Sequence, residues 1–214
     1  MKKAIFVAVA ALSTFPAVAM AHTQPFIGIG YASTNLSGHS SRPGATLFGG
    51  QRFGDNIQVR GSATLARSFY SFDGSVGKDI AASSAVTFEP YVGAGLVSMN
   101  YNQQETGYRS YTQGLFTAFD VPYTYTVPAS IQDSYAMAGA NVGWMVSPRV
   151  QLAFGGGYGH TLTVLNGNGG AVYKGEAQAT FGISKRWATD LQVSYLHLPG
   201  ASLTSYGAGV AYHF

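Results

Sequence analysis

The feature that most constrains this chain is an alternation of apolar and polar residues, with a period of two, along most of its length. Between positions 57 and 66, the odd positions hold Ile, Val, Gly, Ala and Leu, whereas the even positions hold Gln, Arg, Ser, Thr and Ala. The segments 135–146 and 172–183 alternate in the same way. Because successive side chains of a strand point to opposite faces of a sheet, this alternation predicts β-strands whose two faces meet different environments.

The composition limits what these strands can form. After Ala21 no run of about 18 apolar residues exists, which excludes a helical membrane protein. Charged residues make up only 10% of the chain, against about 25% in ordinary soluble domains. In lipid every backbone N–H and C=O must be paired internally, so the alternative to a helix is a closed barrel. The sequence therefore predicts an all-β fold, an antiparallel, transmembrane, up-and-down β-barrel.

Turn residues divide the alternating pattern into ten expected strands. Their approximate ranges are 24–35, 44–53, 57–68, 79–88, 90–101, 133–147, 150–163, 171–183, 188–198 and 201–214. An eight-stranded barrel is the alternative, and it would follow if 171–198 formed a long excursion instead of a hairpin. The alternation within that region favours ten strands.

The connections between the expected strands differ in length, and this difference orients the barrel. Tight turns are expected at Gly54–Asn56, Glu89–Pro90, Ser147–Arg149 and Ser184–Trp187. Outer-membrane barrels have short periplasmic turns and longer outer loops, and an even strand count places both termini in the periplasm. The longest connection, 102–132, is expected to be an outer loop, and loops of this length are usually functional.

The first 21 residues have the composition of a secretory signal peptide. Lys2 and Lys3 precede an apolar stretch from Ala4 to Ala19, and Ala19-Met20-Ala21 forms an A-x-A cleavage site. A positive start, a short apolar stretch and small residues at the cleavage site are the features of such a leader.

The expected organisation is a signal peptide, residues 1–21, followed by one barrel domain, residues 22–214. The expected location is a bacterial outer membrane, after cleavage near Ala21. Removing Lys2 and Lys3 from the twelve basic residues leaves ten, against nine acidic ones. A nearly neutral chain without a basic run gives no reason to expect nucleic acid as a partner. The absence of cysteine means that no disulfide stabilises the fold.

Three short motifs carry a resemblance to a known family. The last six residues resemble the terminal signal that outer-membrane barrels present to their assembly machinery, with Gly209, Tyr212 and Phe214 as its expected elements. Residues 52–56, Arg-Phe-Gly-Asp-Asn, resemble the first periplasmic hairpin of the opacity-protein and small-porin-like barrel family. Residues 90–95, Pro-Tyr-Val-Gly-Ala-Gly, resemble a strand motif of the same family.

This resemblance implies an outer-membrane barrel whose relatives serve as adhesins, small pores, envelope-stabilising proteins or surface antigens. The family's usual members have eight strands, so the additional hairpin expected near 171–198 is a departure from its pattern.

Charged residues on the polar face of the strands are candidates for a functional cluster in the lumen. Unpaired charges in a confined space of low dielectric constant are unfavourable, so these groups are expected to pair across the lumen. We expect Arg52 and Arg60 to meet Glu89 near the periplasmic mouth, with Lys174 and Glu176 closer to the outer end. The cluster would either gate a narrow pore or fill the lumen and close it.

The histidines raise an enzymatic alternative. His39, His160 and His197 are expected near the outer rim, where an enzyme that modifies lipid A would act, and Asp73 and Ser75 are expected in an outer loop. A nucleophile needs an activating base and an orienting group within reach, and no spacing here matches such a set. The sequence predicts no enzyme, no cofactor and no metal site.

The aromatic residues are expected in two places. Those at strand ends should form the interfacial girdles of a barrel; they are Tyr31, Phe53, Phe88, Tyr91, Trp144, Phe181, Trp187, Tyr195, Tyr212 and Phe214. Others lie in the expected outer loop, where exposed aromatic residues favour contact with partners; they are Tyr108, Tyr111, Phe116, Phe119, Tyr123 and Tyr125.

Three functions follow from these expectations. The first is a non-enzymatic outer-membrane surface protein in envelope structure or adhesion, the second a small passive diffusion channel, and the third a lipid A-modifying enzyme. The expected partners are outer-membrane lipid and lipopolysaccharide, the barrel assembly machinery, and ligands on a host or envelope surface.

Overall fold

The structure is a computed structural model that describes residues 25–37, 41–113, 117–165 and 169–214, so the predicted signal peptide lies outside the described residues. Its strands are β1 (Phe26–Leu36), β2 (Arg42–Phe53), β3 (Ile57–Ala66), β4 (Phe69–Lys78), β5 (Ile80–Ala81), β6 (Val86–Gln113), β7 (Thr117–Ser147), β8 (Val150–Leu165), β9 (Ala171–Gly182), β10 (Trp187–Leu198) and β11 (Ala201–His213). A short 3-10 turn, η1 (Gly54–Asn56), joins β2 to β3. Among these described residues, no helix is long and apolar enough to cross a membrane.

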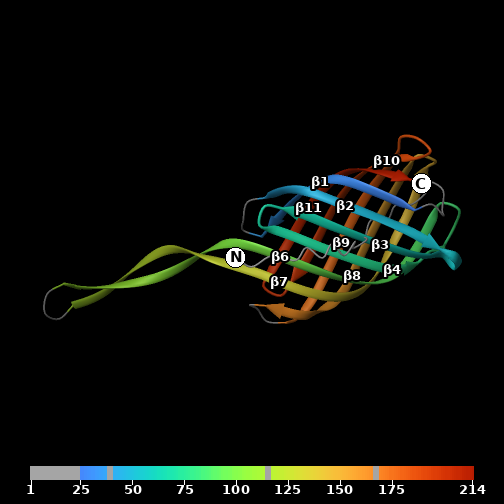
Figure 1. Cartoon of the computed structure of the whole chain (residues 1–214). Coiled ribbons are helices and arrows are strands. Elements are labelled where there is room, and N and C mark those ends of the chain that lie inside the picture. Colours follow the sequence, from blue (N-terminus) through green and yellow to red (C-terminus); the bar gives the residue numbers. More distant parts are fainter. Residues whose placement is uncertain (1–24, 38–40, 114–116, 166–168) are drawn as a thin grey trace, which may run out of the picture.

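The strands form one antiparallel sheet that closes on itself (Figure 1). β1 pairs with β11 along its whole length, and β4 pairs with β6 to complete the ring. In the described ranges this makes a ten-stranded barrel, since β5 is a two-residue piece that lies along β6 next to the end of β4. The predicted ten-stranded barrel is confirmed. The eight-strand alternative is wrong, because β9 and β10 pair as a hairpin from Tyr173–His197 to Gly182–Ala188.

One strand lies elsewhere than the sequence predicted. The expected strand at 79–88 is wrong, and the fourth strand of the barrel is β4, a segment that the sequence analysis left in a connection. The expected turn at Glu89–Pro90 is also wrong, because β6 runs straight through it. Proline cannot donate a ladder hydrogen bond and is tolerated only where none is needed. Pro90 lies beside the gap between β4 and β5, where neither strand pairs with it.

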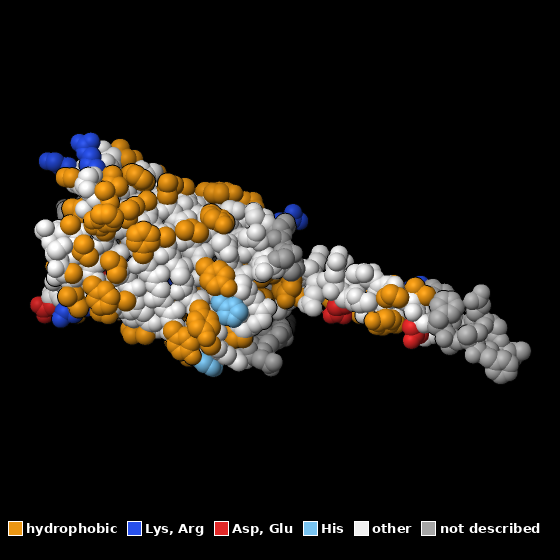
Figure 2. Space-filling view, turned by 180° about the vertical axis from the view of Figure 1, so that it is seen from behind, with side chains coloured by type: hydrophobic (Ala, Val, Ile, Leu, Met, Phe, Trp, Pro, Cys, Tyr) orange, Lys and Arg blue, Asp and Glu red, His pale blue; other side chains and the backbone are white. Residues whose placement is uncertain are grey.

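The two faces of the sheet differ as the alternation predicted. In β3, Gln58, Arg60 and Ser62 are buried in the lumen, whereas Ile57 and Leu65 are exposed on the outer wall. In Figure 2 charged side chains gather at the end of the barrel opposite the projecting parts of β6 and β7, and apolar side chains cover much of the wall between the ends. An apolar outer band around a polar interior is the arrangement of a barrel that spans lipid.

The lumen contains two apolar clusters and many buried polar side chains. Phe26 and Phe48 pack with Ala211 near the periplasmic ends of β1 and β11. At the other end of the same strands, Leu36 and Leu203 belong to a larger apolar cluster. Buried polar and charged side chains, among them Gln58, Arg60 and Glu89, fill much of the remaining space. The interior is therefore packed with side chains, as small barrels permit.

The predicted outer loop at 102–132 is instead a continuation of two strands. β6 and β7 stay paired without a register shift from Val86–Trp144 to Gln113–Thr117. The pairing of β6 with β4 ends at Met99, and the pairing of β7 with β8 begins at Gln132. Residues 100–113 and 117–131 therefore form a two-stranded ribbon, which projects from the barrel in Figure 1 and is called the arm below. At about 3.4 Å per residue, fourteen residues of an extended strand reach roughly 45 Å.

Candidate functional site

The periplasmic part of the lumen contains a buried ion pair. Arg60 of β3 lies against Glu89 of β6, and the Arg60 guanidinium also donates a hydrogen bond of 2.6 Å to Gln58. Arg60 is 1% exposed and Glu89 3% exposed, so the pair is removed from solvent. The strand alternation positions both groups, since each lies on the inward face a few residues from the periplasmic end of its strand. The sequence predicted that these two residues would meet.

Arg52 does not join this pair. It forms its own ion pair with Asp79, a residue that follows β4 and that the sequence analysis did not single out. The expected cluster of Arg52 and Arg60 around one Glu89 is therefore divided into two pairs. The reason is the placement of β4, which brings Asp79 beside the end of β2 and supplies a second carboxylate.

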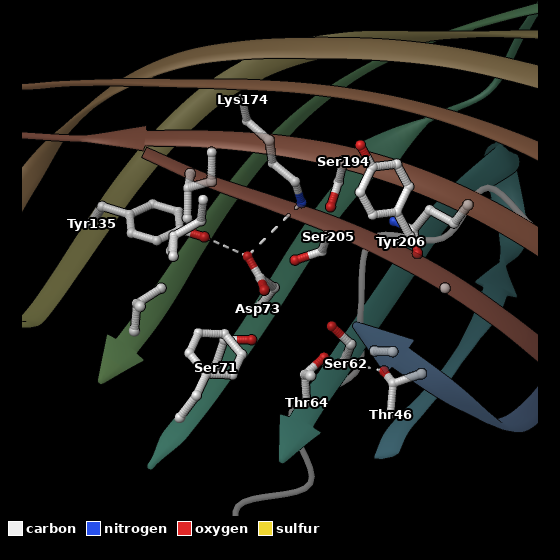
Figure 3. A pocket seen from close by; sticks show the side chains of 17 residues that line it. Thr46, Ser62, Thr64, Ser71, Asp73, Tyr135, Lys174, Ser194, Ser205 and Tyr206 are labelled. Carbon is white, nitrogen blue, oxygen red and sulfur yellow. Dashed lines mark hydrogen bonds and ion pairs between the residues drawn. The ribbon is translucent and has the colours of Figure 1, made fainter. Parts of the chain in front are cut away.

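A second charged group lies closer to the outer end. Lys174 of β9 is 3.3 Å from Glu176 and 3.8 Å from Asp73 of β4. Tyr135 of β7 donates a hydrogen bond of 2.5 Å to the same Asp73 carboxylate (Figure 3). The expectation that Asp73 lies in an outer loop is wrong, as it is for Ser75, because both belong to β4. Lys174 and Glu176 lie together, as expected, and Asp73 and Tyr135 complete the group.

A third polar group was not predicted from the sequence. Asp190 of β10 accepts hydrogen bonds of 2.9 Å from Gln178 and 2.6 Å from Thr180, both on β9. Asp190 is 2% exposed. Its position on the inward face of an alternating strand is the signal that could have identified it.

A cavity of about 80 Å³ lies beside Asp73 and Lys174. The hydroxyl side chains of Thr46, Ser62 and Ser205 also line it (Figure 3). A space of this size has room for a few water molecules. Typical small-molecule sites are several times larger, at about 300–1,000 Å³.

In the arm, the polarity of the two faces of β7 is reversed relative to the barrel. The face that continues the lumen wall carries mostly apolar residues on β7, namely Val121, Tyr123, Tyr125, Val127, Ala129 and Ile131. The face that continues the lipid-facing wall is mostly polar, with Gln104, Thr106, Ser110, Asp120, Thr124 and Thr126. A strand pair in lipid needs an apolar outer face. The arm therefore has the pattern of a ribbon that lies outside the membrane.

Side-chain contacts link the two strands of the arm on the face that continues the lumen wall. Tyr123 and Tyr125 have ring centroids 5.6 Å apart, and the Arg109 guanidinium lies 4.9 Å from the centroid of Tyr123. The Tyr125 hydroxyl donates a hydrogen bond of 3.0 Å to Glu105. This hydrogen bond raises the pKa of Tyr125, because it stabilises the protonated hydroxyl next to a negative charge.

The remaining aromatic residues predicted for the outer loop are placed as follows. Tyr108 pairs with Pro122 on the polar face of the arm and is 69% exposed. Tyr111 and Phe119 pair with each other in the two strands, and Phe116 lies outside the described residues.

The C-terminal residues complete the barrel wall. Gly209 pairs with Gly30 of β1, and the Phe214 N–H donates a hydrogen bond to the carbonyl of Pro25. Tyr212 packs against Trp187 and against Phe214, with ring centroids 4.9 and 5.2 Å apart. These rings form part of an aromatic girdle at the periplasmic end. Tyr91, in contrast, was wrongly expected in a girdle and is buried in the lumen, because β6 is continuous through Pro90.

The histidines form no recognisable catalytic set among the described residues. His160 is exposed at the outer part of β8. His197 contacts Ser202 at 2.9 Å and Tyr173 at a centroid distance of 5.8 Å, and His39 lies outside the described ranges. No group of three or more potential metal ligands occurs in the described part of the chain.

Among known proteins, only solved structures are similar to this chain. No family model matches the chain, and no curated protein sequence matches it. The outer membrane protease OmpT from Escherichia coli is similar over 89% of this chain and 96% of its own, with 9% identity and a TM-score of 0.55. At this identity the likeness concerns the fold alone. The fold is that of an outer-membrane β-barrel.

Two further outer-membrane β-barrels have lower scores. The NanC porin covers 87% of this chain and all of its own, with 9% identity and a TM-score of 0.46. Ail, the attachment invasion locus protein of Yersinia pestis, covers 90% of this chain and 99% of its own, with 12% identity and a TM-score of 0.39. Since no family model matches, the resemblance to the opacity proteins remains a prediction from sequence motifs.

Proposed function

We propose that this outer-membrane β-barrel is a non-enzymatic surface protein that makes adhesive contacts through its arm. It would reside in a bacterial outer membrane after signal-peptide cleavage near Ala21. The opacity proteins, which its motifs resemble, include adhesins of this general kind. Outer-membrane lipid and lipopolysaccharide would surround the wall, and the barrel assembly machinery would insert it.

The arm is the observation that carries this proposal. It places exposed Tyr108, Tyr123 and Tyr125 beyond the barrel rim, on strands that continue the barrel wall. A site on regular strands holds its side chains more firmly than a loop does. Exposed aromatic residues on a firm support suit binding to another surface, because they supply large contact areas at low entropic cost.

A diffusion channel is the second candidate, since the lumen contains a polar cavity beside Lys174 and Asp73. The packing of the lumen argues against it. Phe26 and Phe48 are buried near one end, Leu36 and Leu203 belong to the apolar cluster at the other, and Arg60 is paired and buried. We infer that Arg52, Arg60, Glu89, Lys174 and Glu176 stabilise a closed lumen.

Shortening the arm tests the adhesive function. The variant replaces residues 104–126 by Asn-Gly, so that Gln103 and Val127, which are paired in the structure, flank a two-residue turn. We expect the barrel to fold as before and binding of cells that display it to host-cell or bacterial surfaces to be lost. Unchanged binding by the shortened protein would contradict the adhesive proposal.

Bilayer conductance tests the closed lumen. The refolded protein should give no steady ion current, and Glu176→Ala should leave it silent, because neighbouring side chains still fill the lumen. A stable current that Glu176→Ala alters in ion selectivity would instead favour the diffusion channel.

A further inference from the structure

The two outer edges of the arm differ in what they offer to another strand. The Asn100 N–H donates a hydrogen bond of 2.9 Å to the Ser68 carbonyl, so the backbone groups of this residue point away from β7. Because backbone groups alternate along a strand, those of Gln104, Thr106, Tyr108 and Ser110 point the same way. From Gln104 to Ser110 no described strand pairs with this edge.

The outer edge of β7 is interrupted. Pro122 pairs with Tyr108, and Pro128 pairs with Asn102. In an antiparallel ladder the backbone groups of two paired residues point either toward each other or away from each other. Because those of Asn102 and Tyr108 point away from β7, the nitrogens of Pro128 and Pro122 face the outer edge of β7. Proline has no N–H, and placing it on an edge is a common protection against strand addition.

The arm therefore has one protected edge and one open edge. An open edge of this length is a template for another strand, which adds through main-chain hydrogen bonds. A two-stranded ribbon also becomes more stable when strands are added, since three or more strands favour independent stability. Strand addition at the β6 edge would therefore stabilise the arm as well as bind the partner.

The sequence of the β6 edge is complementary to itself. In an antiparallel pairing of two copies centred on Gly107, Glu105 of one copy lies directly opposite Arg109 of the other. By symmetry, Arg109 of the first copy lies opposite Glu105 of the second. Both residues are exposed on the same face of β6. They would form pairs without direct backbone hydrogen bonds, in which the Cα atoms are about 4.5 Å apart and side chains lie closest. Opposite charges at such positions stabilise a sheet.

We propose that the β6 edge of the arm binds the β6 edge of a second copy of this protein, in the antiparallel register that places Glu105 opposite Arg109. This inference rests on the adhesive function proposed above and names its partner. The two arms then form a four-stranded sheet, in which the protected β7 edges lie on the outside.

The register also determines where the two barrels lie. Each arm leaves its barrel at the outer end, so antiparallel arms place the two barrels at opposite ends of the shared sheet. The two copies therefore belong to two facing membranes. Parallel arms in one membrane would instead bring Glu105 near Glu105 and Arg109 near Arg109, which is unfavourable. The protein would tether one outer membrane to another.

A charge-exchange experiment with the full-length mature protein in lipid vesicles tests this proposal. Glu105→Arg and Arg109→Glu variants are reconstituted separately into vesicles, and vesicle clustering is measured by light scattering. Each variant alone brings like charges together, so we expect clustering to fall by about tenfold relative to the original protein. A mixture of the two vesicle populations restores opposite charges at both positions, and clustering should return.

Recovery in the mixture distinguishes pairing from damage to the arm, since a misfolded arm would not be rescued by a second damaged arm. A second readout uses the absence of cysteine in the chain. Mixed vesicles carrying Glu105→Cys and Arg109→Cys should form a disulfide-linked dimer, because directly opposed residues lie within the Cα distance of a disulfide, about 4.4–6.8 Å.

No clustering of vesicles with the original protein, or no recovery and no disulfide in the mixtures, would overturn the self-pairing. If vesicles with the original protein still bind, through the arm, target cells that lack this protein, the adhesive function stands and only its proposed partner is wrong. If the shortened arm changes neither clustering nor cell binding, both proposals fail.

Discussion

Tyr135 of β7 donates a hydrogen bond to Asp73 of β4, although β6 lies between the two strands. Gly95 of β6 pairs with both residues, with Tyr135 on one side and Asp73 on the other. The tyrosine ring lies over this glycine, since a Cβ at position 95 would be 2.5 Å from the Tyr135 hydroxyl. The absent side chain of Gly95 is therefore what lets the tyrosine reach the carboxylate.

Gly95→Ala should destabilise the barrel. The added methyl group occupies the space of the Tyr135 ring, and overpacking of this kind costs about 1–3 kcal/mol. The free energy of unfolding in lipid vesicles, measured with urea, checks this. Gly175→Ala is the matched control, because a Cβ there meets nothing within 4 Å. Equal stability of the two variants would show that Gly95 does not accommodate Tyr135.

Arg60→Met should destabilise the barrel by about 3–5 kcal/mol, because it leaves the buried Glu89 carboxylate without its partner. Replacing both members, as in Arg60→Met with Glu89→Leu, removes the unpaired charge and should recover most of the loss. Urea unfolding of both variants measures the difference. If the double variant is less stable than Arg60→Met, the proposed pairing in the lumen is not what stabilises these groups.

Ala140→Arg should destabilise the protein by about 2–4 kcal/mol, since Ala140 is at the middle of the lipid-facing part of β7. Thr124→Arg is its control, because Thr124 lies on the same side of the same strand but in the arm. We expect the control to unfold like the original protein. An equal loss in both variants would mean that the arm is not outside the lipid.

Phe214→Ser should reduce the amount of folded protein in the outer membrane of cells. It removes the terminal ring that packs on Tyr212 and that the assembly machinery is expected to recognise. Phe53→Ser removes an aromatic ring of similar exposure from the end of β2 and serves as the control. Similar membrane yields for the two variants would contradict a special role of the last residue.

The sequence was sufficient to predict the barrel and its faces, because strand alternation is a local property. It also predicted that Arg60 meets Glu89, since both lie on inward faces near the periplasmic ends of their strands. It misplaced β4 because the segment Phe69–Lys78 contains Gly74, Ser75 and Gly77, which resemble a turn. Pro90 in turn suggested a strand end, although the gap between β4 and β5 removes the need for its N–H.

These two errors explain what was missed at the candidate site. With β4 treated as a loop, Asp73 could not be placed beside Lys174, and Asp79 could not be assigned to Arg52. The arm was missed for a different reason. The apolar and polar faces of its β7 strand are exchanged relative to the barrel, so the alternation expected for a lipid-facing strand ends near position 132, although the backbone pairing continues.

The most direct test of the whole account is a scan of spin-labelled single cysteines along β7 from 120 to 146, in a chain that otherwise contains none. The account predicts that labels at even positions from 136 to 146 are accessible to oxygen dissolved in lipid, while labels at odd positions there are shielded from both lipid and water. Labels from 120 to 130 should be accessible to a water-soluble relaxation agent on both faces. Access to water at the odd positions from 136 to 146, or access to lipid oxygen throughout 120–130, would contradict a filled transmembrane barrel with an external arm.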